Sequence, residues 1–245
     1  MATVIRLCLC DDDPQFLAAC RKKADSLIAR NNLEVETQEF ESGESLLFFL
    51  DENVSYFDFI MMDMLMGEHN GIETVQILRD HGYEGIVVFL TSSKEYALES
   101  FSVAPFNYVL KQDMATDAFD KIFLDAIEAV KKAEEQKLVI STRRSSVVMN
   151  LDDIIYIESN LRKLIFHTVK GNQDAQYALD DVFTKTREHG FLRCHKSFVV
   201  NSRFVKSCCR TEVVLTTAET IPLGRTYADD FEHGLLKCLR EKITL

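Results

Sequence analysis

Acidic residues follow two apolar runs in the first half of the chain. Residues 11–13 are all aspartate and come directly after the run Val4 to Cys10, while Asp63 closes the run Phe57 to Met62. A carboxylate at such a position is costly to bury unless it lies at a strand end that faces solvent or a metal ion. Carboxylates held together repel one another, and a hard divalent cation with oxygen ligands relieves that repulsion. The pattern therefore predicts a cation site, with Mg²⁺ as the natural occupant.

Two further residues have suitable types and positions to join this site. Thr91 follows the run Ile86 to Leu90, and Lys111 follows the run Phe106 to Leu110. Lysine supplies a second, mobile positive charge, and threonine can donate a hydrogen bond to a phosphoryl oxygen. A carboxylate beside Mg²⁺ and Lys111 is suited to attack phosphorus and form an acyl phosphate. Two of these residues, taken singly, could have a simpler role than one in this site. Asp13 could equally well cap a helix, and Lys111 on its own would be an ordinary surface lysine.

The elements that must position these residues alternate along the chain. From residue 4 to about 135, short apolar runs are each followed by a stretch of helical period. Five such units indicate a doubly wound α/β fold, in which a five-stranded parallel sheet is covered by helices on both faces. Ligands of that fold bind outside the carboxyl ends of the strands. The expected strands are Val4 to Cys10, Leu33 to Phe40, Phe57 to Met62, Ile86 to Leu90 and Phe106 to Leu110.

Residues 4 to about 130 resemble the receiver domain of two-component response regulators, and we expect that domain over residues 1–130. The resemblance rests on an acidic pair after strand one, single residues after strands three and four, an aromatic residue in strand five and the lysine that closes it. These residues are Asp11, Asp12, Asp63, Thr91, Tyr108 and Lys111.

The resemblance implies that a sensor histidine kinase phosphorylates Asp63. It also implies that Mg²⁺ is held by Asp12, Asp63 and the backbone carbonyl of Leu65. Asp11, Thr91 and Lys111 would support the phosphoryl site. Thr91 and Tyr108 would form the switch that reports the phosphoryl group to the outer face of the fourth helix and fifth strand.

Two positions depart from the receiver pattern. Gly67 stands where the family usually has a proline, and Gln112 follows Lys111 where proline and a cis peptide bond are common. The acids and the lysine are all present, which predicts a competent site. A rival interpretation, an aspartyl-phosphate hydrolase, needs a second acid two residues after the nucleophile, and Leu65 occupies that position. We therefore expect a protein that is not an enzyme.

The pattern changes after a charged segment. Residues 131–137 are almost entirely charged, which indicates a solvated helix end passing into a linker. Residues 138–245 contain many short β-patterned runs, and only Leu179 to His189 and Tyr227 to Lys242 have a helical pattern, so this domain is expected to be mostly β. The expected strands are Leu138 to Thr142, Ser146 to Met149, Ile154 to Glu158, Leu164 to Val169, Ala175 to Ala178, Phe198 to Val200, Val213 to Thr217 and Thr220 to Leu223.

The two halves carry opposite net charges. The whole chain has a formal charge of −11, which on its own argues against nucleic acid as a partner. Residues 1–135 hold 11 basic and 26 acidic residues, a charge of −15, whereas residues 136–245 hold 17 and 13, a charge of +4. Between residues 187 and 210 there are six basic residues and one acidic residue, Glu188. Such a cluster indicates a surface that can bind phosphates. Its members are Arg187, Arg193, Lys196, Arg203, Lys206 and Arg210.

Residues from about Leu138 to the end resemble a LytTR-type DNA-binding domain. The resemblance rests on Asp152 to Ser159, on Phe191 to Asn201 and on Ile221 to Arg225. Such domains present loops, not a recognition helix, to successive major grooves, usually as dimers. The carried-over DNA contacts are Arg162 and Lys163 after the first motif, Lys196 in the second and Arg225 in the third. Arg193 and Arg203 are expected as phosphate contacts or structural pairs, and His195 as a structural residue.

The remaining features fix the expected class and compartment. The first ten residues have no export signal, and the longest charge-free stretch, 100–110, is shorter than the roughly 18 residues of a spanning helix. Seven cysteines without a C-x-x-C motif fit a reducing cytoplasm. We expect a cytoplasmic transcriptional regulator that forms a homodimer when phosphorylated and binds double-stranded DNA. The alternative is a receiver whose basic domain binds a protein or a membrane.

Overall fold

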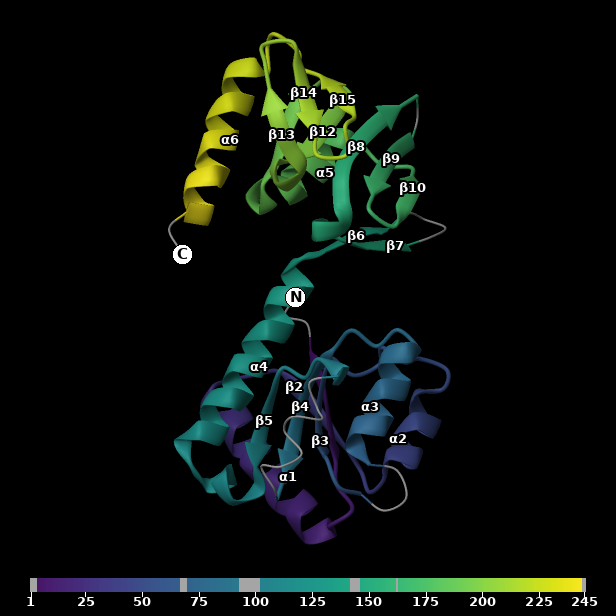
Figure 1. The fold of residues 1–245 in the computed structure, drawn as a ribbon, viewed down its shortest axis with the longest axis vertical. Helices are drawn as coiled ribbons and strands as arrows, with labels where there is room; N and C mark the ends of the chain where they lie inside the picture. Colours follow the sequence, from purple (N-terminus) through teal and green to yellow (C-terminus); the bar gives the residue numbers. More distant parts are fainter. Residues whose placement is uncertain (1–3, 67–69, 93–101, 142–145, 162, 244–245) are drawn as a thin grey trace. The chain divides into compact units, whose positions relative to one another are not determined.

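The computed structural model describes residues 4–66, 70–92, 102–141, 146–161 and 163–243 (Figure 1). The chain divides into two compact units, Met1–Ala133 and Glu134–Leu245. The expected linker, 131–137, overlaps the end of one helix, Asp117–Glu135, and the start of a strand, Lys137–Ser141. Within the described residues, each unit has two hydrophobic clusters of its own.

The first unit contains the predicted five-stranded parallel sheet, with strand order β2-β1-β3-β4-β5. Strand β2 lies on one side of β1, and β3, β4 and β5 follow in order on its other side. This arrangement leaves β2 and β5 as the edge strands. The strands are β1 (Ile5–Cys10), β2 (Val35–Phe40), β3 (Phe59–Asp63), β4 (Ile86–Thr91) and β5 (Asn107–Leu110).

Four described helices cover this sheet: α1 (Pro14–Arg30), α2 (Gly43–Leu50), α3 (Gly71–Asp80) and α4 (Asp117–Glu135). Successive side chains of a strand point to opposite faces. In β1, Leu7 and Leu9 therefore pack in the cluster with α1 and α4, and Cys8 and Cys10 pack in the cluster with α2 and α3. Both faces of β1 are buried from Leu7 to Cys10, which is an apolar run, whereas Arg6 is exposed. The helix expected after β4 falls on residues 93–101, outside the described residues.

The second unit is mostly β, as predicted, and its strands are antiparallel. The main sheet has the order β10-β9-β8-β12-β11, a smaller sheet has the order β13-β14-β15, and β6 pairs with β7. The strands are β6 (Lys137–Ser141), β7 (Ser146–Asn150), β8 (Ile154–Asn160), β9 (Lys163–Thr168), β10 (Gly171–Ala175), β11 (Phe191–His195), β12 (Phe198–Asn201), β13 (Val205–Cys208), β14 (Glu212–Leu215) and β15 (Thr220–Pro222).

Three of these strands differ from the sequence prediction. Strand β10 was expected at Ala175 to Ala178 but lies at Gly171–Ala175, and β11 and β13 were not predicted as strands. Strand β10 is an edge strand of mostly exposed polar residues. Its hydrogen-bonded pairing with β9 stabilises it, and burial of apolar side chains contributes little. Strands β11 and β13 mix charged and apolar residues without a clean alternation, so the period-2 pattern is weak there.

Helices α5 (Leu179–Thr186) and α6 (Ala228–Ile243) pack against this unit at different clusters. Ile154, Ile157 and Phe166 belong to the cluster with α5, whereas Ile155 and Tyr156 belong to the cluster with α6. No helix in the described part of the chain is long and apolar enough to cross a membrane.

Candidate functional site

Three carboxylates lie together at the carboxyl ends of β1 and β3. The two strands are neighbours, with Cys10 opposite Met62, so the residues that follow them, Asp11 and Asp63, come to the same edge. One oxygen each from Asp11, Asp12 and Asp63 can be chosen so that all three lie within 4.8 Å of one another. Asp11 and Asp63 are buried and Asp12 is exposed. The sheet topology thus brings the predicted acids together.

Lys111 lies between the two buried carboxylates. It follows β5 at the same edge, and its Nζ lies 2.7 Å from Asp11 Oδ2 and 2.8 Å from Asp63 Oδ2. The ammonium also lies 4.4 Å from the centre of the Phe16 ring, a cation–π contact that the sequence did not suggest. Burial lowers the pKa of Lys111, but the two carboxylates outweigh burial and raise it above the ordinary value. Lys111 is therefore a fixed positive charge at this site.

Asp11 is poorly satisfied without a further cation. Its Oδ1 accepts a hydrogen bond from the backbone N–H of Asp13, but its buried Oδ2 has no well-directed hydrogen bond despite the nearby Lys111 ammonium. Burial raises the pKa of the Asp11 carboxyl, and the charge of Asp63 raises it further, whereas Lys111 and the Asp13 N–H oppose them. One lysine facing three carboxylates leaves an excess of negative charge. A hard cation with oxygen ligands fits this donor set.

Asp13 has a different role from its two neighbours. Its side chain accepts hydrogen bonds from the backbone N–H groups of Gln15 and Phe16 at the start of α1. This is the helix-cap alternative that the sequence left open for Asp13. The cap fixes the chain immediately after Asp11 and Asp12, and it places the Phe16 ring under Lys111.

The other predicted receiver residues lie around this cluster. Thr91 is buried at the end of β4, next to the strand that ends in Asp63. Tyr108 lies on the edge strand β5 and is 40% exposed. The backbone N–H of Leu65 lies 3.3 Å from Asp63 Oδ1, so the turn after β3 folds back on the carboxylate. The described residues contain no cis peptide bond, the bond after Lys111 included, and Gly67 lies outside them.

In the second unit, three turns that carry the predicted DNA-binding residues are held side by side by backbone hydrogen bonds. Ser159, before the β8–β9 turn, donates to the carbonyl of Ser197 in the β11–β12 turn at 2.8 Å. Gly224, between β15 and α6, donates to the carbonyl of Cys194 at 2.8 Å. The exposed side chains of Lys196 and Arg225 therefore come from adjoining segments. Arg162 lies outside the described residues.

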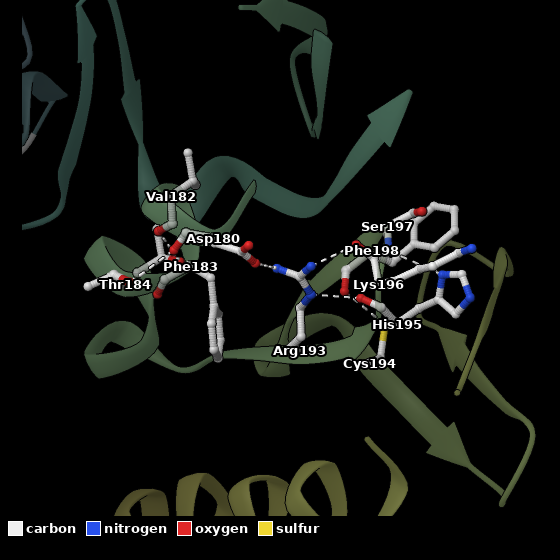
Figure 2. Close-up of polar contacts among 11 residues, drawn as sticks. Asp180, Val182, Phe183, Thr184, Arg193, Cys194, His195, Lys196, Ser197 and Phe198 are labelled. Atoms are coloured by element: carbon white, nitrogen blue, oxygen red, sulfur yellow. Dashed lines mark hydrogen bonds and ion pairs between the residues drawn. The ribbon is translucent and has the colours of Figure 1, made fainter. Parts of the chain in front are cut away.

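Arg193 is engaged within the turn that carries Lys196 (Figure 2). Its guanidinium donates to the carbonyl of His195 at 2.7 Å, to the carbonyl of Lys196 at 2.6 Å and to Asp180 Oδ1 at 2.9 Å. The Arg193 side chain is only 14% exposed. These contacts favour the structural-pair alternative for Arg193. The sequence did not single out Asp180, because its partner is 13 residues away and no short spacing connects them.

The other predicted contacts divide by exposure and pairing. Lys163 is exposed and pairs with Asp174 of β10 at 2.7 Å, and Arg203 forms an ion pair with Asp152. Both pairs are solvated, so each cation can exchange its partner for a phosphate at low cost. His195 Nδ1 accepts the backbone N–H of Ser197 at 3.2 Å, consistent with the structural role expected for it.

Two family models match the chain in the order expected. The response regulator receiver domain matches residues 7–123, and the LytTr DNA-binding domain matches residues 144–235. The chain is a LytTR-type response regulator. A receiver domain implies a histidine kinase as partner, and a LytTR domain implies binding to DNA.

Two relatives align across both halves of this response regulator, and one solved structure aligns with about half of the chain. It is 25% identical to the sensory transduction protein LytT of Bacillus subtilis (strain 168), over 95% of this chain and 99% of that protein. It is also 25% identical to the transcriptional regulatory protein YpdB of Escherichia coli (strain K12), over 77% of this chain and 80% of that protein. The response regulatory domain of protein mrkE from Klebsiella pneumoniae is 21% identical, with a TM-score of 0.44, over 52% of this chain and 99% of that chain.

Proposed function

We propose that a sensor histidine kinase transfers a phosphoryl group to Asp63 of this response regulator. The phosphorylated receivers then pair two chains, and the pair of LytTR domains binds double-stranded DNA to regulate transcription. The cluster of Asp63, Asp11 and Lys111 is the single observation that carries the proposal. The chain acts in the cytoplasm as phosphoryl acceptor and DNA-binding protein and not as an enzyme.

Asp63 is the carboxylate best placed to be the nucleophile. It is the last residue of the central strand β3, whereas Asp11 follows the neighbouring strand β1 and Asp12 is exposed; Lys111 contacts both Asp63 and Asp11. In the transfer a carboxylate oxygen of Asp63 forms a bond to phosphorus while the bond from phosphorus to the kinase histidine nitrogen breaks. Lys111 neutralises the phosphoryl oxygens as they approach, and the hydroxyl of Thr91 donates a hydrogen bond to one of them.

Asp12, Asp63 and the backbone carbonyl of Leu65 would hold Mg²⁺, with Asp11 close by. The excess of carboxylate charge over the single charge of Lys111 supports this choice. Bound Mg²⁺ would neutralise charge on the transferring phosphoryl group and orient it toward Asp63. Asp11 and Asp12 would then serve as ligand support and not as nucleophiles.

Thr91 and Tyr108 would transmit the effect of phosphorylating Asp63 to the exposed face of β5. Thr91 on β4 and Tyr108 on β5 belong to paired strands, since Thr91 lies opposite Leu110 and Phe89 opposite Tyr108. A hydrogen bond drawn from Thr91 toward the phosphoryl group would leave room for the Tyr108 ring to turn inward. That movement would alter the exposed face of the edge strand β5, where Phe106 is also exposed. A changed edge face is suited to pairing with a second receiver.

Lys196 and Arg225 would contact bases or phosphates from adjoining segments, joined by Lys163 and Arg162, with Arg203 as a phosphate contact. Arg193 would position the Lys196 turn. One domain offers few such contacts, so pairing two domains on repeated half-sites raises occupancy through effective concentration. This coupling explains how phosphorylation of Asp63 can change DNA binding at a distance.

The test is phosphorylation of the whole chain by a small-molecule phosphodonor in the presence of Mg²⁺. Asp63→Asn is expected to abolish the acid-stable, hydroxylamine-sensitive label, whereas Asp80→Asn, an exposed control at the end of α3, should keep it. Undiminished labelling of Asp63→Asn would remove Asp63 from the role. Selection from random-sequence DNA, with and without phosphodonor, would then identify the site and the effect of phosphorylation on it.

A further inference from the structure

Two adjacent cysteines at the β13–β14 turn, Cys208 and Cys209, take no part in the sites described above. All seven cysteines lie in the described part of the chain, and only these two are exposed. Cysteine reactivity requires both access and a thiolate. The other five, which are buried or half-buried, are Cys8, Cys10, Cys20, Cys194 and Cys238.

Cys209 has surroundings that stabilise a thiolate. Its Sγ lies 3.5 Å from the Thr211 hydroxyl oxygen. Hydrogen bonds from that hydroxyl and from the backbone N–H groups of Thr211 and Glu212 lower the pKa of the Cys209 thiol below its ordinary value. Burial acts in the opposite direction elsewhere and raises the pKa of Cys10 and of Cys194 to about 12. Cys209 thus combines an exposed position with a thiol that ionises more readily than usual.

Cys208 differs from its neighbour although it is the next residue. It is the last residue of β13 and lies opposite Val213 of β14. Partial burial and the nearby acidic groups of Glu232 and Cys209 raise the pKa of the Cys208 thiol. The pair therefore combines one thiol inclined to ionise with one that keeps its proton.

We propose that Cys209 is a peroxide-reactive thiol, that Cys208 resolves its oxidised form into a Cys208–Cys209 disulfide, and that this disulfide weakens DNA binding. In the first step the Cys209 sulfur attacks one oxygen of hydrogen peroxide. The O–O bond breaks, hydroxide leaves and is protonated to water, and Cys209 becomes a sulfenic acid. In the second step the Cys208 sulfur attacks the Cys209 sulfur, the S–O bond breaks, and water leaves with the proton of Cys208.

The disulfide cannot form without a change in the turn. Adjacent Cα atoms lie about 3.8 Å apart, whereas relaxed disulfides join Cα atoms roughly 4.4–6.8 Å apart. Successive side chains along a strand also point to opposite faces. Closing the ring must therefore rotate the backbone at residues 208 and 209. That rotation opposes the pairing of Cys208 with Val213 and the 2.9 Å hydrogen bond from the Cys209 N–H to the Glu212 carbonyl.

A change in this turn reaches the proposed DNA surface within a few bonds. The carbonyl of Thr211 accepts a 2.8 Å hydrogen bond from the N–H of Leu223, two residues before Arg225. The N–H of the intervening Gly224 donates a hydrogen bond to the carbonyl of Cys194, which lies two residues before Lys196. Displacing Thr211 therefore disturbs the segment that positions Arg225. A strained disulfide of this kind is also easily reduced, which makes the change reversible.

The test treats the full-length protein with hydrogen peroxide and measures both the thiols and DNA affinity. Chymotrypsin should release residues 205–215, which contain Cys208 and Cys209 and no other cysteine. We expect this peptide to become lighter by two hydrogen atoms, and DNA affinity to fall on the order of ten-fold, the loss expected for one misplaced base contact. Dithiothreitol should reverse both changes.

Three variants separate the steps. Cys209→Ser should abolish the reaction, and Cys208→Ser should leave a sulfenic acid that dimedone traps, with DNA affinity close to that of the reduced protein. Thr211→Val removes the hydroxyl beside Cys209 but keeps the backbone carbonyl that Leu223 contacts, and it should slow oxidation several-fold. Cys238→Ser, at the half-buried cysteine of α6, is the matched control and should behave as the unmodified chain does. An unreacted Cys209, an intermolecular disulfide in place of the internal one, or a disulfide without loss of affinity would each overturn the proposal.

Discussion

Lys111 Nζ lies 2.8 Å from Asp63 Oδ2, although the two residues are 48 positions apart in the sequence. The same ammonium lies 2.7 Å from Asp11 Oδ2. One lysine thus forms ion pairs with two buried carboxylates that lie at the ends of neighbouring strands. A group that already sits against the acceptor carboxylate needs little rearrangement to meet the oxygens of an arriving phosphoryl group.

Replacing Lys111 should slow phosphorylation more than it changes the fold. In Lys111→Met the side chain keeps most of its length, while the charge and the cation–π contact of the ammonium with Phe16 are lost. We expect the rate of labelling by a small phosphodonor to fall by roughly 100-fold, as for removal of one preorganised donor. Lys121→Met, at an exposed position of α4, is the control and should label at the normal rate. Equal rates for the two variants would show that Lys111 does not stabilise the transferred group.

Asp11→Asn should stabilise the metal-free protein. Burial raises the pKa of the Asp11 carboxyl, so the folded state favours its protonated form, and the ionised form present at neutral pH costs stability. The asparagine still has an oxygen that can accept the hydrogen bond from the Asp13 N–H, and Lys111 retains its ion pair with Asp63. We expect a gain of about 1 kcal/mol in the free energy of unfolding, measured with denaturant in chelator. Asp12→Asn, at an exposed acid, should change stability less; a lower stability for Asp11→Asn would contradict the charge-repulsion argument.

Mg²⁺ should raise the thermal stability of the receiver through the carboxylate cluster. A ligand that binds only the folded state stabilises it by about 1.4 kcal/mol at ten times its dissociation constant. Thermal unfolding followed across a Mg²⁺ titration should therefore shift upward and return when chelator is added. Asp12→Asn and Asp63→Asn should each remove most of the shift, whereas Asp80→Asn should keep it. A shift that survives both substitutions would place the cation elsewhere.

Arg193 and Lys196 should respond differently to substitution. Arg193→Ala removes the donor to two backbone carbonyls and the partner of Asp180, so we expect a loss of about 1–3 kcal/mol in unfolding free energy as well as weaker DNA binding. Lys196→Ala removes an exposed side chain, so stability should hold while DNA affinity falls. Denaturant unfolding and gel shifts on both variants separate these outcomes. Normal stability in Arg193→Ala would argue against its positioning role.

DNA binding should weaken steeply with salt. Neutralising phosphates releases counterions, so the logarithm of the binding constant should fall linearly with the logarithm of salt concentration. A side chain that contacts phosphate should reduce the slope by roughly 1 when removed, whereas one that contacts a base should relax the sequence preference instead. Measuring the slope for Arg203→Ala and Arg225→Ala assigns each residue to one kind of contact. Salt-independent binding would contradict recognition through the basic domain.

The sequence alone predicted most of the receiver. The inner strands β1, β3 and β4 are buried along most of their length, so each is a mainly apolar run, and Asp11, Asp63 and Thr91 stand where these runs stop. In a parallel sheet the ends of the runs meet, which is why Asp11, Asp63 and Lys111 could be grouped before their contacts were known. The antiparallel domain was less predictable. Edge strand β10 and strands β11 and β13 are held by pairing with neighbours, which leaves little hydrophobic period to detect.

Residue type and order therefore determined the fold class, the acidic site and the basic character of the second domain. Apolar runs mark the segments that are buried, and the net charge of each domain can be counted directly from its residues. Tertiary structure decided which charges are available. Arg193 and Lys196 are three residues apart and both positively charged, yet one is enclosed by Asp180 and two carbonyls while the other faces solvent. Cys208 and Cys209 are adjacent, yet only one lies against the hydrogen-bond donors of a turn. Asp180 lies 13 positions from Arg193, and the other partners are close in sequence but are aimed at these groups only by the local backbone geometry, so only the folded chain brings the contacts together.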